Sequence, residues 1–185
     1  MVLCLWELND DLRLLNKITM TEADFAFRKT VDITPDFLKK HGIKGLILDV
    51  DNTLTTHDNP VPADGITEWL ENMRNNGIKL IIVSNNHPER VKPFADPLGL
   101  DFVSDSGKPL RKGYTAAMKK MGLTQKETAA VGDQLFTDIW GANRSGLHSI
   151  LVGRISAKEP PHIHLKRLLE FPVKLVYFIE KRLEK

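Results

Sequence analysis

Two aspartates stand one residue apart at the end of a strongly apolar segment of this 185-residue chain. The segment, IKGLILDV (43–50), includes Asp49 and is followed by Asp51 and Thr53. Carboxylates beside apolar residues carry a desolvation cost that a bound cation would offset. Because side chains alternate along an extended chain, Asp49 and Asp51 are expected to point the same way. One carboxylate could then attack a reacting group while the other exchanges a proton with it.

A second apolar segment, IKLIIVS (78–84), ends in Ser84 and is followed by Asn85 and Asn86. The hydroxyl and amide groups of these residues could donate hydrogen bonds to phosphate oxygens. Further along the chain, Lys108 stands just before a predicted helix. A lysine in this place could neutralise phosphate charge as a point cation.

A third apolar segment, TAAVGD (128–133), ends in Asp133, and Asp138 follows five residues later. Hard oxygen ligands of this kind suit Mg²⁺, which keeps several waters and binds few carboxylates besides a substrate phosphate. Taken alone, each of these polar clusters is a weak or moderate signal. Their order, each at the end of an apolar segment, favours phosphate chemistry over helix caps and surface charge.

The periodicity of the chain predicts alternating strands and helices, which is typical of an α/β domain with a doubly wound parallel sheet. In such sheets the ligand binds outside the carboxyl ends of the strands, at a switch point in strand order. The strands are expected over 43–50, 78–84, 101–105, 128–133 and 148–153. The helices are expected over 35–41, 64–76, 88–96, 109–121 and 135–144.

These residues resemble the haloacid dehalogenase (HAD) superfamily, whose four motifs are similar to LDVDNTLT, VSN, Lys108 and VGDQLFTD. A closer similarity to the YqeG-type HAD phosphatases of subclass IIIA is carried by DITPDFLKKHGIKGLILDVDNTLT, IIVSNN, FADPLG and VGDQLFTDIWGANRSG. The resemblance implies a Rossmann-like HAD phosphatase core over 31–157. Residues 1–30 are expected to form a poorly defined N-terminal extension, in which Met20 is an alternative start.

The resemblance also implies a Mg²⁺-dependent phosphatase of phosphate monoesters. Asp49 would be the nucleophile that becomes an aspartyl-phosphate, and Asp51 would protonate the leaving oxygen and then activate water. Ser84 and Lys108 would complete the catalytic set by stabilising the transferring phosphoryl group. The substrate-binding residues would be Thr53, Asn85 and Lys108. The Mg²⁺ ligands would be Asp49, the backbone carbonyl of Asp51, Asp133 and Asp138.

The motif spacing leaves no room for a cap domain. Only residues 54–64 separate the first motif from the next predicted helix, and 23 residues between Ser84 and Lys108 already hold a helix and a strand. An uncapped site is open, which favours a bulky substrate or a site completed by a partner or a surface. His57 and Asp58 could line its entrance, with a solvated loop as the alternative reading.

Several substrates and one other class of function stay open. Because the YqeG type resembles fungal mitochondrial enzymes that dephosphorylate phosphatidylglycerophosphate, this phospholipid head group is one candidate. Soluble phosphometabolites, nucleotides and phosphoproteins are the alternatives among enzymes. A receiver-like or HAD-like module that binds without turnover is the alternative of another class, although a receiver does not need Asp51 beside its phosphorylated aspartate.

Composition and charge limit the partners and the cellular location that can be expected of the protein. The formal net charge of +2 gives no field typical of a nucleic-acid binder. A single cysteine, Cys4, permits no internal disulfide. Because the sequence has neither a signal peptide nor an apolar run of ~18 residues, a cytoplasmic location is expected.

Residues 158–185 hold seven Lys/Arg against four Glu, a net charge of +3. They predict a basic amphipathic helical tail, either on the inner membrane surface or packed on the sheet.

Overall fold

The structure is a computed structural model that describes residues 21–57 and 59–156. A single six-stranded sheet runs through it, in the order β1-β6-β5-β2-β3-β4 with every neighbouring pair parallel. The strands are β1 (Phe25–Phe27), β2 (Gly45–Leu48), β3 (Lys79–Val83), β4 (Asp101–Val103), β5 (Thr128–Gly132) and β6 (His148–Val152). From β2 the chain builds the sheet first in one direction and later in the other. The predicted doubly wound parallel sheet is therefore confirmed.

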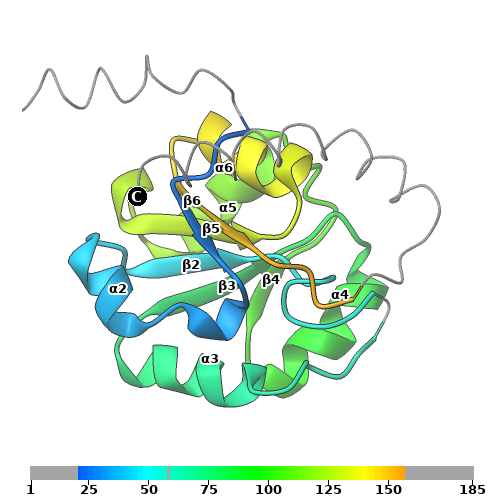
Figure 1. Ribbon diagram of the computed structural model, residues 1–185. Helices are drawn as coiled ribbons and strands as arrows, with labels where there is room; N and C mark the ends of the chain where they lie inside the picture. Colours follow the sequence, from blue (N-terminus) through cyan, green and yellow to red (C-terminus); the bar gives the residue numbers. More distant parts are fainter. Residues whose placement is uncertain (1–20, 58, 157–185) are drawn as a thin grey trace, which may run out of the picture.

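Helices cover both faces of the sheet (Figure 1). One face packs against α2 (Pro35–Lys40), α3 (Ile66–Asn75) and α4 (Pro88–Ala95). The other face packs against α5 (Arg111–Met121) and α6 (Trp140–Arg144). Thr34 caps α2 through its Oγ1, which accepts a hydrogen bond from the backbone N of Phe37 at 3.2 Å.

The apolar segments form strands that are buried on both faces, as their continuous hydrophobicity predicts. All four residues of β2 and all five of β5 are buried. Leu46 and Leu48 contribute to the core under α3, whereas Ile47 contributes to the core under α5. Each such side chain stabilises the fold by about 1.5–3 kcal/mol through burial, so the sheet gives the site a rigid base.

The edge strand β1 is a feature that the sequence analysis did not predict. It pairs with β6 through Phe25↔Ile150 and the two following registers. Its two phenylalanines pack edge-to-face on Phe37 of α2, with ring centroids 4.9 Å and 5.0 Å apart. Three residues are too few to show the alternating pattern of a strand. The sequence therefore did not predict β1 within residues 1–30, which were expected to form a poorly defined extension.

A second difference concerns the helix expected over 135–144. Residues Leu135–Ile139 form a π-helix, and α6 begins only at Trp140. Single π-turns of this kind occur frequently at functional sites. Five residues are too few for hydrophobic periodicity to distinguish a π-helix from an α-helix.

Some predictions fall on residues that the structure does not describe. The basic tail over 158–185, most of the extension over 1–30 and the side chain of Asp58 lie outside the described residues. The domain boundaries proposed at 31 and 157 therefore stay predictions. Within residues 21–57 and 59–156, none of the helices is long and apolar enough to cross a membrane.

Candidate active site

The polar residues predicted at the strand ends gather at the carboxyl edge of the sheet. Asp49 follows β2 and Asp133 follows β5, and these strands are neighbours at the point where the strand order switches. The backbone N of Asp49 donates to the carbonyl of Val131 at 3.0 Å, so the two strand ends stay paired up to the aspartates. This is the place at which open α/β sheets bind ligands.

Three carboxylates and one lysine form the centre of the site. One carboxylate oxygen from each of Asp49, Asp133 and Asp138 lies within 4.8 Å of the other two. Lys108 Nζ lies 2.6 Å from Asp49 Oδ1 and 2.7 Å from Asp138 Oδ1. Asp133 and Asp138 are buried, with 1% and 3% of their surface exposed. When all four side chains are ionised, their formal charge is −2, in surroundings largely removed from water.

The electrostatics of this cluster depend on its burial. Burial alone would lower the pKa of Lys108, but the carboxylates of Asp138 and Asp49 outweigh it and raise the pKa above its ordinary value. Burial raises the pKa of Asp138 to about 6 against the attraction of Lys108. Burial also raises the pKa of Tyr114, whose hydroxyl donates to the carbonyls of Thr137 and Asp138 at 3.1 Å and 3.2 Å. Lys108 is therefore a permanent cation at neutral pH, and Tyr114 a neutral hydrogen-bond donor.

Asp138 reaches the cluster from the π-helix. Its Oδ2 accepts a hydrogen bond from the backbone N of Gln134 at 3.1 Å, and its Oδ1 accepts one from Lys108. The two oxygens are thus held by different parts of the chain. The side chain of Asp138 lies against Gly132, at the end of β5.

Asn85 positions the loop that carries Lys108. Its Oδ1 accepts hydrogen bonds from the backbone N of Lys108 at 2.6 Å and from Ser106 Oγ at 2.9 Å, while its Nδ2 donates to the carbonyl of Lys108 at 3.1 Å. Thr53 is buried, and its Oγ1 lies 3.4 Å from Asp49 Oδ2. The roles of Asn85 and Thr53 in substrate binding stay predictions.

The side chain of Asp51 lies apart from the carboxylate cluster and has its own partners. Asn86 Nδ2 donates to Asp51 Oδ2 at 2.6 Å, and Arg90 Nη2 donates to Asp51 Oδ1 at 2.7 Å. His57 Nδ1 lies 3.9 Å from Asp51 Oδ2. Asn86 was expected to donate to phosphate, whereas Arg90 was not expected at the site. An arginine in the first turn of a helix carries no motif, so no sequence signal pointed to it.

The turn after Asp51 holds that aspartate in place. Asn52 adopts a left-handed conformation with φ 64°, which asparagine tolerates better than most residues. Its backbone N donates to the carbonyl of Thr55 at 2.7 Å, while the carbonyl of Val50 accepts from Leu54 at 2.9 Å. Asp51 and Thr55 also form an isolated parallel bridge. The strand end and the turn therefore act as one support for the two aspartates.

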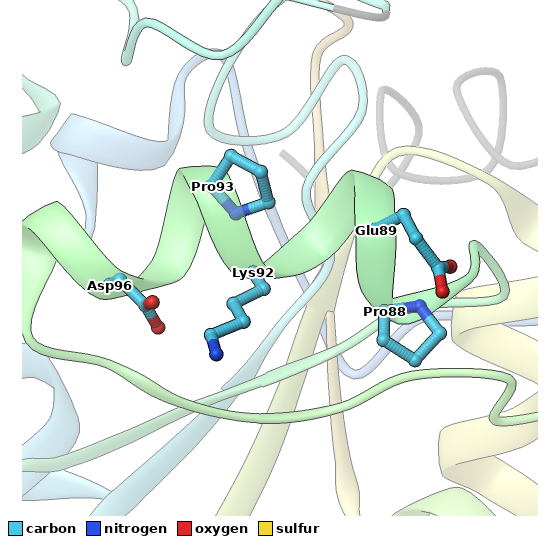
Figure 2. Close-up of a pocket in the computed structure, with 5 residues that line it drawn as sticks. All are labelled: Pro88, Glu89, Lys92, Pro93 and Asp96. Carbon is cyan, nitrogen blue, oxygen red and sulfur yellow. The ribbon is translucent and has the colours of Figure 1, made fainter.

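A hollow on the outer face of α4 is distinct from this site. It is lined by Pro88, Glu89, Lys92, Pro93 and Asp96 (Figure 2). None of the predicted catalytic residues lines it. The carboxyl edge of the sheet, rather than this hollow, is the candidate active site.

Comparison with known proteins agrees with this arrangement. The chain is 43% identical over 127 residues to the "probable phosphatase YqeG" of Bacillus subtilis (strain 168), a match that covers 69% of this chain and 74% of that relative. The family model of haloacid dehalogenase-like hydrolases matches residues 55–146. The chain belongs to the YqeG-type phosphatases of the HAD superfamily.

More distant sequence relatives match parts of this YqeG-type chain, and two solved structures share its fold. The family model "Mitochondrial PGP phosphatase" matches residues 12–91. "Phosphatidylglycerophosphate phosphatase 1, chloroplastic/mitochondrial" of Arabidopsis thaliana is 28% identical over 137 residues, which cover 69% of this chain and 39% of that protein. A crystal structure from Listeria monocytogenes serotype 4b matches with a TM-score of 0.52 at 22% identity, covering 64% of this chain and 85% of that chain. NagD from E. coli K-12 matches with the same TM-score at 17% identity, covering 62% and 90% of the respective chains.

Proposed function

We propose that this chain is a Mg²⁺-dependent phosphatase that hydrolyses phosphate monoesters through an aspartyl-phosphate on Asp49. Lys108 carries the proposal, because its Nζ contacts both Asp49 and Asp138 within a buried cluster that also contains Asp133. A lone structural ion pair would not require two further buried carboxylates. A site for a cation and a phosphoryl group accounts for all four side chains.

The residues present fit a magnesium ion. Asp49, Asp133 and Asp138 offer three carboxylate oxygens close to one another, which is the ligand chemistry that Mg²⁺ prefers. The formal charge of −2 left on the cluster after pairing with Lys108 would be balanced by a divalent cation. The backbone carbonyl of Asp51 is the fourth proposed ligand. Mg²⁺ bound there would neutralise negative charge on the phosphoryl oxygens.

Each protein residue of the proposed site has its own role in the two phosphoryl-transfer steps. The Asp49 carboxylate attacks phosphorus, the ester P–O bond breaks, and Asp51 gives its proton to the leaving oxygen. Asp51 next takes a proton from water, whose oxygen attacks the phosphorus and releases phosphate from Asp49. Lys108 and Ser84 stabilise the charge that develops on the phosphoryl group during both transfers.

The test is hydrolysis of p-nitrophenyl phosphate by the purified full-length protein with Mg²⁺. We expect activity that EDTA removes, and an Asp49→Asn variant that is inactive while its melting temperature stays close to that of the wild type. Turnover by Asp49→Asn at the wild-type rate would contradict the mechanism. No turnover by the wild type would favour the alternative of a HAD-like or receiver-like module that binds without catalysis.

For the substrate, we propose a bulky, amphiphilic phosphate monoester. The large hydrophobic side chains exposed in the described part of the chain are Val61, Leu110 and Ile155, with 62%, 56% and 41% of their surface exposed. We call these three residues the apolar rim. They lie on the segments that follow β2, β4 and β6, and the carboxyl ends of parallel strands meet at the same edge of a sheet.

The strand order supports a rim that surrounds the site. The strands β6 and β4 lie on opposite sides of β2, so Ile155 and Leu110 flank the loop that carries Val61. The backbone N of Ile155 donates to the carbonyl of Asn52 at 3.2 Å, next to Asp51. In Figure 1 the orange end of β6 and the cyan loop after β2 lie together on one side of the sheet. Exposed apolar residues around a phosphate site suit a substrate with an apolar part.

Phosphatidylglycerophosphate is our candidate for that substrate, and the inner membrane surface our candidate for the place of action. The name of the Arabidopsis relative and the match of residues 12–91 support the candidate. The predicted basic tail would add attraction to anionic lipid. Flotation of full-length protein with anionic vesicles, compared with a 1–157 truncation, tests the tail. A panel of phosphorylated lipids, sugars, nucleotides and peptides distinguishes the lipid from the soluble alternatives.

A further inference from the structure

Each oxygen of the Asp51 carboxylate has a different donor. Asn86 Nδ2 lies 2.6 Å from Oδ2, and Arg90 Nη2 lies 2.7 Å from Oδ1. The donors come from two neighbouring parts of the chain, the loop after β3 and the first turn of α4. Two donors on two oxygens fix both the plane of the carboxylate and the direction in which it points.

We infer that Arg90, together with Asn86, is a positioning residue that holds Asp51 in the orientation required for proton transfer to the leaving oxygen. The inference rests on the proposed function and adds a residue from outside the four motifs. Asp49 and Asp51 are close in sequence, yet the structure bonds them to different cations. Lys108 contacts Asp49, and Arg90 contacts Asp51. The nucleophile and the proton donor are thus oriented independently.

Further contacts hold the Arg90 side chain and its backbone in position. Its side chain is 21% exposed, and its Nη2 also lies 3.3 Å from the carbonyl of Asn59, in the loop that follows the first motif. The backbone N of Arg90 donates to the carbonyl of His87 at 3.0 Å, at the start of α4. The guanidinium therefore links α4 to that loop while it contacts Asp51. Both contacts come from one nitrogen, Nη2, whose two N–H groups lie in the guanidinium plane and are more directional than those of a rotating ammonium.

The same segment also carries the proposed phosphate ligand. Ser84 Oγ accepts a hydrogen bond from the backbone N of Asn86 at 3.1 Å. Ser84, Asn86 and Arg90 are therefore parts of one short, internally bonded stretch from the end of β3 into α4. This stretch sets the position of the phosphoryl group relative to the proton donor. Misplacing a reacting group by about 1 Å can lower a rate by about 10²-fold.

The chemistry of the leaving group makes this role measurable. An aliphatic alkoxide leaves poorly without a proton, so transfer from such an ester to Asp49 depends on Asp51. p-Nitrophenolate leaves readily as the anion, so the same transfer from p-nitrophenyl phosphate does not. Hydrolysis of the aspartyl-phosphate requires Asp51 to accept a proton from water whichever ester was the substrate. A misplaced Asp51 should therefore slow the first step only for aliphatic esters and the second step for both.

The experiment compares Arg90→Met with Lys92→Met, a matched control on the same helix. Lys92 lies in the hollow on the outer face of α4 (Figure 2) and is not part of the site. With β-glycerophosphate we expect Arg90→Met to lose about 10–100-fold in kcat, a part of what general acid catalysis supplies. With p-nitrophenyl phosphate we expect a rapid burst of one p-nitrophenol per enzyme, followed by slow turnover. Lys92→Met should behave as the wild type, and Arg90→Lys should recover part of the loss.

Three outcomes would overturn the inference. One is an equal loss on both substrates without a burst, which indicates a structural role only. Another is a raised KM with unchanged kcat, which indicates a substrate ligand, and a third is wild-type behaviour. If Arg90→Met fails to fold, Asn86→Ser removes the other donor, keeps the charge, and must give the same dependence on the leaving group. An inactive wild type would overturn the proposed function as well. An active wild type together with an Arg90→Met variant that behaves like it would overturn this inference alone.

Discussion

The carboxylate of Asp138 occupies the space in which a side chain on Gly132 would begin. A Cβ built on Gly132 would overlap the Cβ and the carboxylate of Asp138. Gly132 is the last residue of β5, and Asp138 belongs to the π-helix that follows. The glycine is therefore part of the site, because its missing side chain lets Asp138 cross the strand end toward Asp133.

A Gly132→Ala variant should reproduce the loss caused by Asp138→Ala. The new methyl group would displace Asp138 from Lys108 and from the backbone N of Gln134, and we expect activity to fall by about 10²-fold. The measurement is kcat/KM for p-nitrophenyl phosphate in both variants, with melting temperatures recorded beside it. Wild-type activity in Gly132→Ala would show that the position of Asp138 does not matter.

Removal of a proposed metal ligand should separate metal binding from folding. Magnesium at about 100 times its Kd would stabilise the wild type by about 2.7 kcal/mol, and each kcal/mol raises Tm by about 2–4 °C for a chain of this size. We expect Asp133→Asn to fold and to lose most of this Mg²⁺-dependent rise. Asp101→Asn, which changes an exposed aspartate at the start of β4, is the control and should keep it. An unchanged rise in Asp133→Asn would remove Asp133 from the ligand set.

Replacing the apolar rim should affect lipid substrates alone. In the triple variant Val61→Ser, Leu110→Ser, Ile155→Ser we expect unchanged hydrolysis of p-nitrophenyl phosphate, because none of these side chains belongs to the catalytic cluster. Full burial of one such side chain is worth about 1.5–3 kcal/mol. Three side chains that insert only partly into the membrane should therefore contribute at least about 1.4 kcal/mol to binding, so their replacement should lower vesicle affinity at least tenfold. Sedimentation with anionic vesicles measures this loss. Equal binding by wild type and variant would argue against the rim as a contact surface.

The stability of the fold should depend on Glu127 in a defined pH range. Hydrogen bonds from the Lys44 side chain and from Thr124 lower the pKa of Glu127 from 4.5 to about 2. Because the pKa is lower in the folded state, the carboxylate stabilises the fold above pH 4.5, and this contribution disappears as the pH falls toward 2. We expect the urea midpoint of Glu127→Gln to lie below that of the wild type at pH 7.

The check is the difference between these midpoints as the pH is lowered. The difference in urea midpoint between wild type and Glu127→Gln should shrink between pH 4.5 and pH 2. Glu71→Gln, which changes an exposed glutamate on α3, is the control, and its urea midpoint should stay close to that of the wild type. A gap that stays constant down to pH 3 would mean that the Glu127 charge does not stabilise the fold.

The sequence predicted the parts of the site that depend on strand ends. Continuous apolar segments identify strands buried on both faces, and in a parallel sheet their carboxyl ends must meet. Asp49, Asp133 and Lys108 could therefore be expected near one another, and the structure brings them together with Asp138. Thr124 and Glu127 form a capping box, a feature whose spacing is itself a sequence signal.

Other parts depend on contacts that no spacing reveals. The strand β1 is set by its pairing with β6, and three residues carry no period of their own. The contact between Asp138 of the π-helix and Gly132 is likewise defined only by the packed structure. Arg90 reaches Asp51 from a helix 39 residues later in the chain. Such long-range polar contacts leave no local pattern in a single sequence.

The central claim is that Asp49 carries the phosphoryl group between the two steps. An Asp51→Asn variant, which cannot take a proton from water, should accumulate this intermediate when mixed with p-nitrophenyl phosphate and Mg²⁺. Acid quenching and peptide mass spectrometry should then find one phosphate on the peptide that contains Asp49, and none after Asp49→Asn is added to the variant. Release of p-nitrophenol without any covalent phosphate, or phosphate on another residue, would contradict the mechanism.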